Sequence, residues 1–423
     1  MSDYQQRIKA SWLHISDLHV FPEADTRFIL EDYLKLAKVI SPQFLVVTGD
    51  FRHKKYKTDF SLAKNYLESI INIFHISKED TFLVPGNHDV NTFYGRNDAI
   101  AEIRLKTMKD YNVYAQYMST RETLYDGFGE YEDFVHDFYS DSSVKDTRVT
   151  TPSQIQSLVW NNQINIVLLN TAIISDGDGT EQIIDINALS NCCINPQFPT
   201  IMLGHHGIET LFRTHQERLT SYIDNREVSA YLHGDIHKYA NNPIQKISTP
   251  NRTIPSIACS KSAPQSGDGY SDIGVVYYEW KSDNNTYVQA YRWSSKSGFV
   301  EDSSYYYEIN NRFYFPMLYN RENIIDRTES LLGRVKSLAQ NQQADFMVGE
   351  WVDEAEEIWQ ENHPEAIGRS LLLFYYNKAK IGMYNEMLRA RCIHRELKQM
   401  EKLEHKTVRM LDETEQYLFS TEG

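Results

Sequence analysis

The chain has 423 residues, of which 41% are hydrophobic, 13% aromatic and 24% charged. This composition is typical of a globular protein with a large domain and an appendage, or with two or three domains, and it excludes extensive disorder. The formal net charge of -15 argues against a surface that grips long duplex nucleic acid, because that affinity depends on lysine and arginine.

No segment approaches the roughly 20 apolar residues that cross a bilayer, and the first residues do not have the pattern of a signal peptide. The four cysteines, two of them adjacent at Cys192 and Cys193, do not make the framework of a disulfide-stabilised domain. We therefore expect a cytoplasmic protein with free thiols and no membrane partner.

Six short apolar runs end in polar or glycine-containing clusters, and each predicts a buried strand that presents polar side chains at its carboxyl end. In chain order they are residues 11–19, 44–50, 81–89, 164–172, 200–207 and 229–237. Residues 27–40 and 59–74 have helical spacing and lie between the first three runs. Strands that alternate with helices predict an α/β domain with ligands at the carboxyl ends of the strands.

An insertion of roughly residues 91–150 separates the third run from the fourth. It has eleven aromatic residues from Phe93 to Tyr139, interleaved with acidic ones. One interpretation is a small helical subdomain in which these rings form their own core. The other is a lid whose rings stack on a base or a sugar.

Beyond Arg252, three runs at residues 253–260, 274–280 and 286–293 have no helical segment between them. They predict a second sheet, antiparallel, that ends near residue 310. We therefore expect a catalytic domain over residues 1–310.

A C-terminal helical domain is expected over residues 320–423. No lysine or arginine lies between Phe346 and Ala366, whereas the segment that follows is rich in basic residues. That segment has an amphipathic face made by Ile393, Leu397, Met400 and Leu403. We expect this face to pack against the catalytic domain or a partner helix, and nucleic-acid contact through the basic side is the alternative.

The expected strand ends carry an ordered series of metal-ligating and acid–base side chains. They are Asp17 and His19 in "SDLH", Asp50 in "TGD", Asn87, His88 and Asp89 in "GNHD", His205 and His206 in "GHH", and Asp235 and His237 in "GDIH". A lone aspartate after a strand is commonly a helix cap, and a lone histidine is commonly a satisfied core or surface residue. Five such clusters at five expected strand ends are better explained by one shared site.

This series resembles the calcineurin-like metallophosphoesterase superfamily over about residues 11–300. The resemblance implies a four-layer α/β/β/α sandwich, here with an aromatic-rich insertion and a C-terminal helical region. It also implies a metal-dependent phosphoric ester hydrolase, in which two divalent ions hold the phosphoryl group and activate water. Mixed imidazole and carboxylate ligands suit Mn, Fe, Zn or Ni, and Mn is the metal that we expect.

The same resemblance implies a ligand set for each ion, with Asp50 as the bridge. The first ion would take Asp17, His19, Asp50 and His237, and the second would take Asp50, Asn87, His205 and one residue of "GDIH". The family usually has Gly-His-x-His there, whereas Asp235 stands in place of its first histidine. We expect Asp235 to be a ligand that shifts preference toward Mn or Mg, and the alternative is loss of the second site.

Other motif residues would act on the substrate. His88 is implied to stabilise or protonate the leaving oxygen, and Asp89 to orient its ring, although capping of the next helix explains Asp89 equally well. His206 is expected to contact phosphate, and Arg52 and His53 in "GDFRH" to reach the same pocket.

The motifs "GDFRH" and "GNHD" differ from those of Ser/Thr protein phosphatases and are more similar to the branch with the Mre11/SbcD nucleases and the cyclic-nucleotide phosphodiesterases. We therefore expect a phosphodiesterase or nuclease that acts on nucleotides or nucleic acid, with short or single-stranded substrates favoured over long duplexes. One alternative is a phosphomonoesterase acting on a small metabolite. The other is a phosphoesterase-like scaffold whose tail recruits a partner in a bacterial repair or defence system.

Overall fold

The structure is a computed structural model. It describes residues 7–21, 26–53, 60–107, 120–148, 155–176, 181–195, 198–236, 243–264, 272–302, 313–318, 359, 365–380, 384–400 and 403–419. The chain divides into two compact units, Met1–Tyr319 and Asn320–Gly423.

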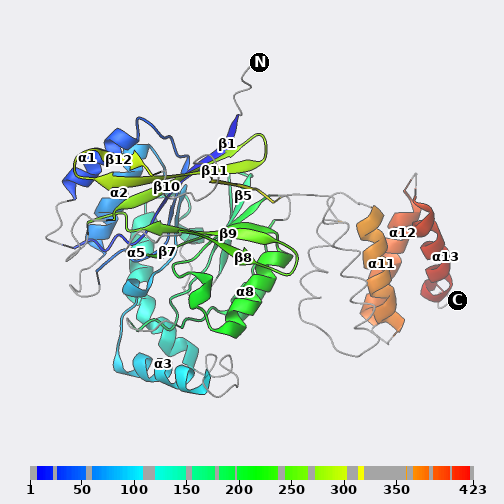
Figure 1. Cartoon of the computed structure of the whole chain (residues 1–423). Coiled ribbons are helices and arrows are strands. Elements are labelled where there is room, and N and C mark those ends of the chain that lie inside the picture. Colours follow the sequence, from blue (N-terminus) through cyan, green and yellow to red (C-terminus); the bar gives the residue numbers. More distant parts are fainter. Residues whose placement is uncertain are drawn as a thin grey trace, which may run out of the picture. The chain divides into compact units, whose positions relative to one another are not determined.

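Two mixed β-sheets form the centre of the first unit (Figure 1). The first sheet consists of β1 (Ile8–Ile15), β2 (Phe44–Val47), β3 (Thr81–Leu83), β10 (Gly274–Lys281), β11 (Asn285–Ser294), β12 (Gly298–Glu301) and β13 (Phe313–Pro316). Its order is β12-β11-β10-β1-β2-β3, and β13 pairs with β11. The second sheet consists of β4 (Gln156–Trp160), β5 (Ile164–Leu168), β6 (Thr200–Leu203), β7 (Val228–Ile236), β8 (Ile244–Ser248) and β9 (Thr253–Ser260). Its order is β4-β5-β6-β7-β9-β8.

Helices cover the outer face of each sheet. Those of the first sheet are α1 (Arg27–Leu36), α2 (Ser61–Phe74) and α5 (Gly129–Tyr139), and those of the second are α7 (Ile186–Ser190) and α8 (Arg213–Asn225). Alternate residues of β1 face opposite ways: Trp12 packs between the sheets, whereas Leu13 and Ile15 pack toward the helices. Burial on both faces explains why these strands read as continuous apolar runs. The predicted four-layer α/β/β/α sandwich is confirmed.

The parallel parts of the two sheets position the motifs. Strands β1, β2 and β3 are parallel to one another, and so are β5, β6 and β7. Parallel strands present their carboxyl ends at one edge of a sheet. The loops after β1, β2, β3 and β6 and the end of β7 therefore converge.

The strands after Arg252 do not form one antiparallel sheet, so that expectation is wrong. Strand β9 pairs in parallel with β7 in the second sheet, whereas β10 pairs antiparallel with β1 and β11 pairs antiparallel with β10 in the first sheet. The reason lies in burial: β9 is apolar on both faces and fits the interior of a sheet, and nothing in its own sequence specifies which strand lies beside it.

Aromatic residues of the insertion belong to the core of the first sheet. The buried rings of Tyr131, Phe134 and Phe138 on α5 share one cluster with the residues of α1 and α2. The ring of Phe134 lies 5.0 Å from that of Phe51 and 4.8 Å from that of Phe60, measured between centroids. These rings therefore neither make a separate core nor lie open for stacking, contrary to both interpretations.

Other helices of the insertion are α3 (Tyr94–Thr107), η3 (Asp126–Phe128) and α6 (Lys145–Arg148). At the start of α3, Phe93 is 40% and Tyr94 83% exposed. The aromatic residues at positions 111, 114 and 117 lie outside the described residues.

The second unit contains α11 (Glu365–Lys380), α12 (Tyr384–Lys398) and α13 (His405–Phe419). The predicted amphipathic face is buried within this unit: Ile393 and Leu397 of α12 pack with Leu371 of α11 and Leu411 of α13. Most of the acidic segment that precedes α11 lies outside the described residues. Within the part of the chain that the structure describes, no helix combines the length and the apolar character needed to cross a membrane.

Burial of the α5 rings makes a testable difference between two aromatic residues of the insertion. Phe134→Ala should lower the free energy of unfolding by about 3–5 kcal/mol, because it opens a cavity between α5 and the first sheet. The exposed Tyr94 is the matched control, and Tyr94→Ala should change the free energy of unfolding by less than about 0.5 kcal/mol. Urea unfolding of the full chain measures both, and equal effects would contradict the shared core.

Candidate metal centre

Four of the predicted ligands have a left-handed backbone conformation. The φ angle is 51° at Asp17, 41° at His19, 57° at Asp50 and 60° at Asp235. Such conformations cost roughly 1–3 kcal/mol each and persist only where the surroundings fix them. Here the loops fix one another, because the Asp17 amide donates to the Gly49 carbonyl and the His19 amide to that of Asp50. The sharp turns aim the side chains at the edge where the strands end.

Two glycines of the motifs are required by close contact. A Cβ atom at Gly86 would lie 2.2 Å from the Asp50 Oδ1 atom, and one at Gly234 would lie 1.9 Å from the Ser16 Oγ atom. A larger residue at Gly86 would push apart the loops after β3 and β2, and one at Gly234 would push β7 away from the loop after β1. The glycines of "GNHD" and "GDIH" therefore serve the approach of the backbone to the carboxylates.

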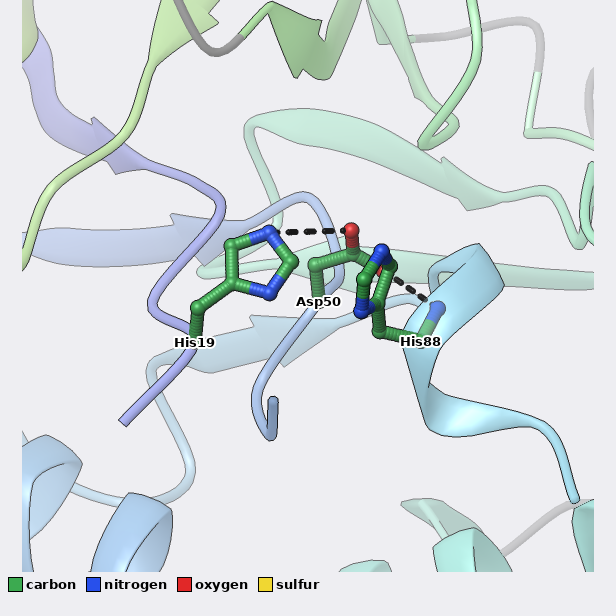
Figure 2. Close-up of side chains that lie close together, drawn as sticks. All are labelled: His19, Asp50 and His88. Carbon is green, nitrogen blue, oxygen red and sulfur yellow. Dashed lines mark hydrogen bonds and ion pairs between the residues drawn. The ribbon is translucent and has the colours of Figure 1, made fainter. Parts of the chain in front are cut away.

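Asp50 lies at the centre of the converging loops and is fully buried. Its Oδ2 atom is 3.2 Å from the His19 Nε2 atom and 3.4 Å from that of His205, and its Oδ1 atom accepts a hydrogen bond from the His88 amide. Figure 2 shows His19 and His88 on opposite sides of this carboxylate. Asp50 therefore has one oxygen held by the backbone and the other between two imidazoles, as a bridging ligand requires.

A second group of donors surrounds His205. Its Nε2 atom is 2.8 Å from the Asn87 Oδ1 atom and 3.9 Å from the Asp235 Oδ1 atom. Asn87 begins the short helix η2 (Asn87–Asp89) after β3, and Asp235 lies near the end of β7. The structure thus brings Asp50, Asn87, His205 and Asp235 together, as predicted for the second ion.

The donor set fits metal ions. Ligand atoms of Asp17, Asp50 and His205 lie within 4.8 Å of one another, and so do those of His19, Asp50 and His88. The buried Asp50 Oδ2 atom has no hydrogen-bond partner within the described ranges. A buried carboxylate oxygen is costly unless a positive charge faces it, and carboxylate oxygens with imidazole nitrogens are the ligands that Mn, Fe and Zn accept.

The charges of the site lead to the same conclusion. Burial lowers the pKa of His19, but the carboxylates of Asp50 and Asp17 outweigh that effect and raise the pKa to about 10. Burial likewise opposes protonation of His205, yet Asp50, Asp17 and Asp235 raise its pKa well above the ordinary value. The carboxylates thus create a demand for positive charge that bound divalent ions would meet.

Two threonines hold the histidines from behind, Thr48 through its backbone carbonyl and Thr171 through its hydroxyl. The His205 Nδ1 atom lies 2.6 Å from the Thr48 carbonyl oxygen, a hydrogen bond that turns Nε2 toward Asp50. The Thr171 Oγ1 atom accepts from the backbone amides of His205 and His206. Sequence reasoning missed both threonines as site residues, and their position directly after apolar runs was the available signal.

His88 lies beside two other imidazoles of the site. Its ring centroid is 4.4 Å from that of His19 and 5.9 Å from that of His53. Its side chain is partly exposed, in contrast to the buried His19 and Asp50. Its assignment as a proton donor stays a prediction.

Asp89 acts on the backbone of two loops. Its carboxylate accepts hydrogen bonds from the amides of Gly86, Asp50 and Phe51. Burial and the nearby Asp50 raise its pKa to about 7, and the Gly86 amide opposes that rise. Both oxygens are occupied by amides, and the contacts join the loop after β2 to the turn after β3.

The remaining predicted residues have different surroundings. The His206 Nδ1 atom is 3.0 Å from the Thr171 hydroxyl, and burial lowers the pKa of this histidine to about 3. The Arg52 guanidinium contacts Asn91 and the first turn of α5, and its expected phosphate contact stays a prediction. His237 lies outside the described residues, so the fourth ligand of the first ion also stays a prediction.

The chain is similar in sequence to known proteins. The family model described as calcineurin-like phosphoesterase matches residues 11–239. The uncharacterised metallophosphoesterase-like protein YydB of Bacillus subtilis (strain 168) is 26% identical over 252 residues, which cover 56% of this chain and 50% of that protein. The chain thus matches about half the length of this curated relative.

Solved structures with a similar fold include Vacuolar Protein Sorting 29 from Cryptosporidium parvum, with a TM-score of 0.33 and 9% identity over 73% of this chain and 100% of that chain. Another is GAP50, the anchor in the inner membrane complex of Plasmodium, with a TM-score of 0.36 and 13% identity over 74% and 91% of the two chains. The family model spans more than half of the 423 residues and includes every motif from "SDLH" to "GDIH". The chain therefore belongs to the calcineurin-like phosphoesterase family, a family of metal-dependent phosphoric ester hydrolases.

Proposed function

We propose that this chain is a two-metal phosphodiesterase that hydrolyses phosphodiesters of nucleotides or nucleic acid. The observation that carries the proposal is the buried Asp50 carboxylate, which lies between two imidazoles within a ring of further oxygen and nitrogen donors. Such an arrangement suits two cations that share one carboxylate.

Each ion has a defined set of candidate ligands. Asp17, His19 and Asp50 would hold the first ion together with His237, and Asp50, Asn87, His205 and Asp235 would hold the second. When bound, the two ions supply Lewis acidity to the phosphoryl oxygens and lower the pKa of water. The Asp235 carboxylate makes the second set harder than a second imidazole would, which favours Mn.

His88 is the candidate for proton donation to the leaving oxygen. Its backbone is anchored to Asp50, while its ring lies beside His19 and His53. A group in that place needs to hold a proton near neutral pH, which imidazole does. His206, held by Thr171, and His53 would contact the phosphate.

Substrate class follows from the motifs, the charge and the insertion. The sequences "GDFRH" and "GNHD" resemble those of diester-cleaving relatives. The net charge of -15 disfavours long duplexes, and the exposed rings of Phe93 and Tyr94 follow the His88 turn closely in the chain and could stack on a base. We also propose that the C-terminal helices bind a protein partner.

Asp50→Asn tests the metal site. We expect the purified variant to lose at least one metal ion per chain and to lose more activity than the roughly 10- to 100-fold that removal of an outer hydrogen-bond partner costs. The matched control is Asp224→Asn, since Asp224 is a buried carboxylate bonded to Arg252 outside the site. Elemental analysis and Mn titration calorimetry measure the change, and unaltered metal content in Asp50→Asn would refute the assignment.

Asp235 decides whether the second ligand set is complete. Asp235→His should keep two metal ions per chain, whereas Asp235→Ala should lose the second, because the alanine removes a donor that faces His205. Asp137→Ala, at an exposed carboxylate paired with Lys64, is the control. Equal metal content in all three variants would mean that Asp235 is not a ligand.

A substrate panel with added Mn tests the reaction. Bis(p-nitrophenyl) phosphate should be hydrolysed faster than p-nitrophenyl phosphate, and short single-stranded oligonucleotides faster than long duplex DNA. Cyclic nucleotides and RNA complete the panel, with Asp50→Asn as the blank. Preference for the monoester would favour a phosphomonoesterase, and absence of both metal and hydrolysis would favour a scaffold.

A further inference from the structure

Arg52 is a buried cation that joins three segments beside the candidate metal centre. Its side chain is 7% exposed, and its guanidinium lies over the Phe60 ring at 4.7 Å from the centroid. The Nε atom donates to the His88 carbonyl at 3.2 Å, one terminal nitrogen donates to Asn91, and the other pairs with Glu130 on α5. The planar guanidinium carries several N–H donors, which lets it bond to separate partners at once.

His88 is consequently held at both of its backbone groups. Its amide donates to the Asp50 Oδ1 atom at 2.8 Å, and its carbonyl accepts from Arg52. These two bonds fix the position of its Cα atom relative to Asp50 and leave only the side-chain torsions to place the ring. Arg52 therefore affects where the imidazole can lie without touching it.

Helix α5 takes part in this arrangement. Glu130 lies in its first turn, and the Asn91 amide donates to the Gly127 carbonyl just before that helix. The rings of Tyr131 and Phe134 on α5 pack on Phe51, the neighbour of Arg52 in the chain. The insertion is thus fastened to the His88 turn by charge and by packing.

A direct phosphate contact from Arg52 would disturb these bonds. The guanidinium already donates to three protein oxygens, and one partner is a carboxylate that would have to give up its cation. Glu130 is 56% exposed, so release of this pair alone would cost little, but the bonds from the buried arginine to the His88 carbonyl and Asn91 would be lost with it. The geometry favours a structural use of the arginine.

We infer that Arg52 is a positioning residue for His88 and that Glu130 makes the insertion helix α5 part of this support. The inference rests on the proposed function, because it assigns to His88 the proton transfer described above. Arg52 and Glu130 would then set the rate of the reaction through His88 and leave the affinity for phosphate unchanged.

The first test needs no substrate. In metal-free protein with 13C-labelled histidine, Arg52→Gln and Glu130→Gln should both shift or broaden the imidazole signal that His88→Ala removes. Arg104→Gln is the control, because Arg104 pairs with Asp176 and also fastens the insertion, but away from His88. An unchanged His88 signal in Glu130→Gln would overturn the inference even if Arg52→Gln fails to fold.

The second test is kinetic. Arg52→Gln should lower kcat by up to roughly 100-fold with KM unchanged, since displacement of a catalytic group by about 1 Å has an effect of that size. The loss should be larger for a poor leaving group and should disappear in the His88→Ala background. Arg52→Lys should not restore the rate, because an ammonium group lacks the planar fork.

The outcomes separate the two proposals. A raised KM that persists in His88→Ala would show that Arg52 contacts the phosphate and would overturn the positioning role. If the wild-type chain hydrolyses nothing in the panel, the proposed function fails, while the histidine spectra still decide whether Arg52 and Glu130 hold His88.

Discussion

The Asp50 carboxylate is buried at the point where the two sheets end, and its negative charge has to be compensated. Two imidazoles, from the loop after β1 and the loop after β6, face its second oxygen. These loops belong to different sheets, so the charge can be met only if the sheets pack with their carboxyl ends at the same edge. The apolar cluster around Trp12 and Phe44 between the sheets secures that alignment. The packing between the sheets therefore determines whether the two imidazoles can face Asp50.

A second shell of polar contacts keeps the ligands in place. Thr48 and Thr171 bind the histidine turn, and Asp89 accepts hydrogen bonds from four backbone amides of two loops. Each contact satisfies a buried polar group that would otherwise lose its hydrogen bond to water. Arg52 extends the network to the insertion, so helix α5 of the outer layer takes part in the geometry of the site. Rigid support of this kind holds a few side chains in a fixed arrangement.

Continuous apolar runs that end in functional residues predicted an α/β domain with its site at the strand ends, because strands buried on both faces have such sequences. The two-sheet sandwich was implied by the resemblance that the motifs carry. Proximity of Asp17, Asp50, Asn87, His205 and Asp235 followed from the rule that parallel strands end at one edge. Strand partners were harder to predict: β9 joined the second sheet and β10 the first, since pairing depends on neighbours distant in sequence. The role of the α5 rings was missed for the same reason. An aromatic side chain has the same composition signal whether it stacks on a ligand or on Phe51.

The left-handed backbone at Asp17, His19, Asp50 and Asp235 limits which residues can occupy these positions. Aspartate, asparagine, histidine and glycine tolerate that conformation, whereas branched side chains do not. Three of these four residue types, aspartate, asparagine and histidine, can also bind metal ions. Most residues that the turns tolerate are therefore possible ligands. A single exchange among these residues, such as aspartate for histidine in "GDIH", would alter the hardness of the candidate ligand set and leave the turn intact. Metal preference in this scaffold can thus drift by point substitution, with no need to rebuild the fold.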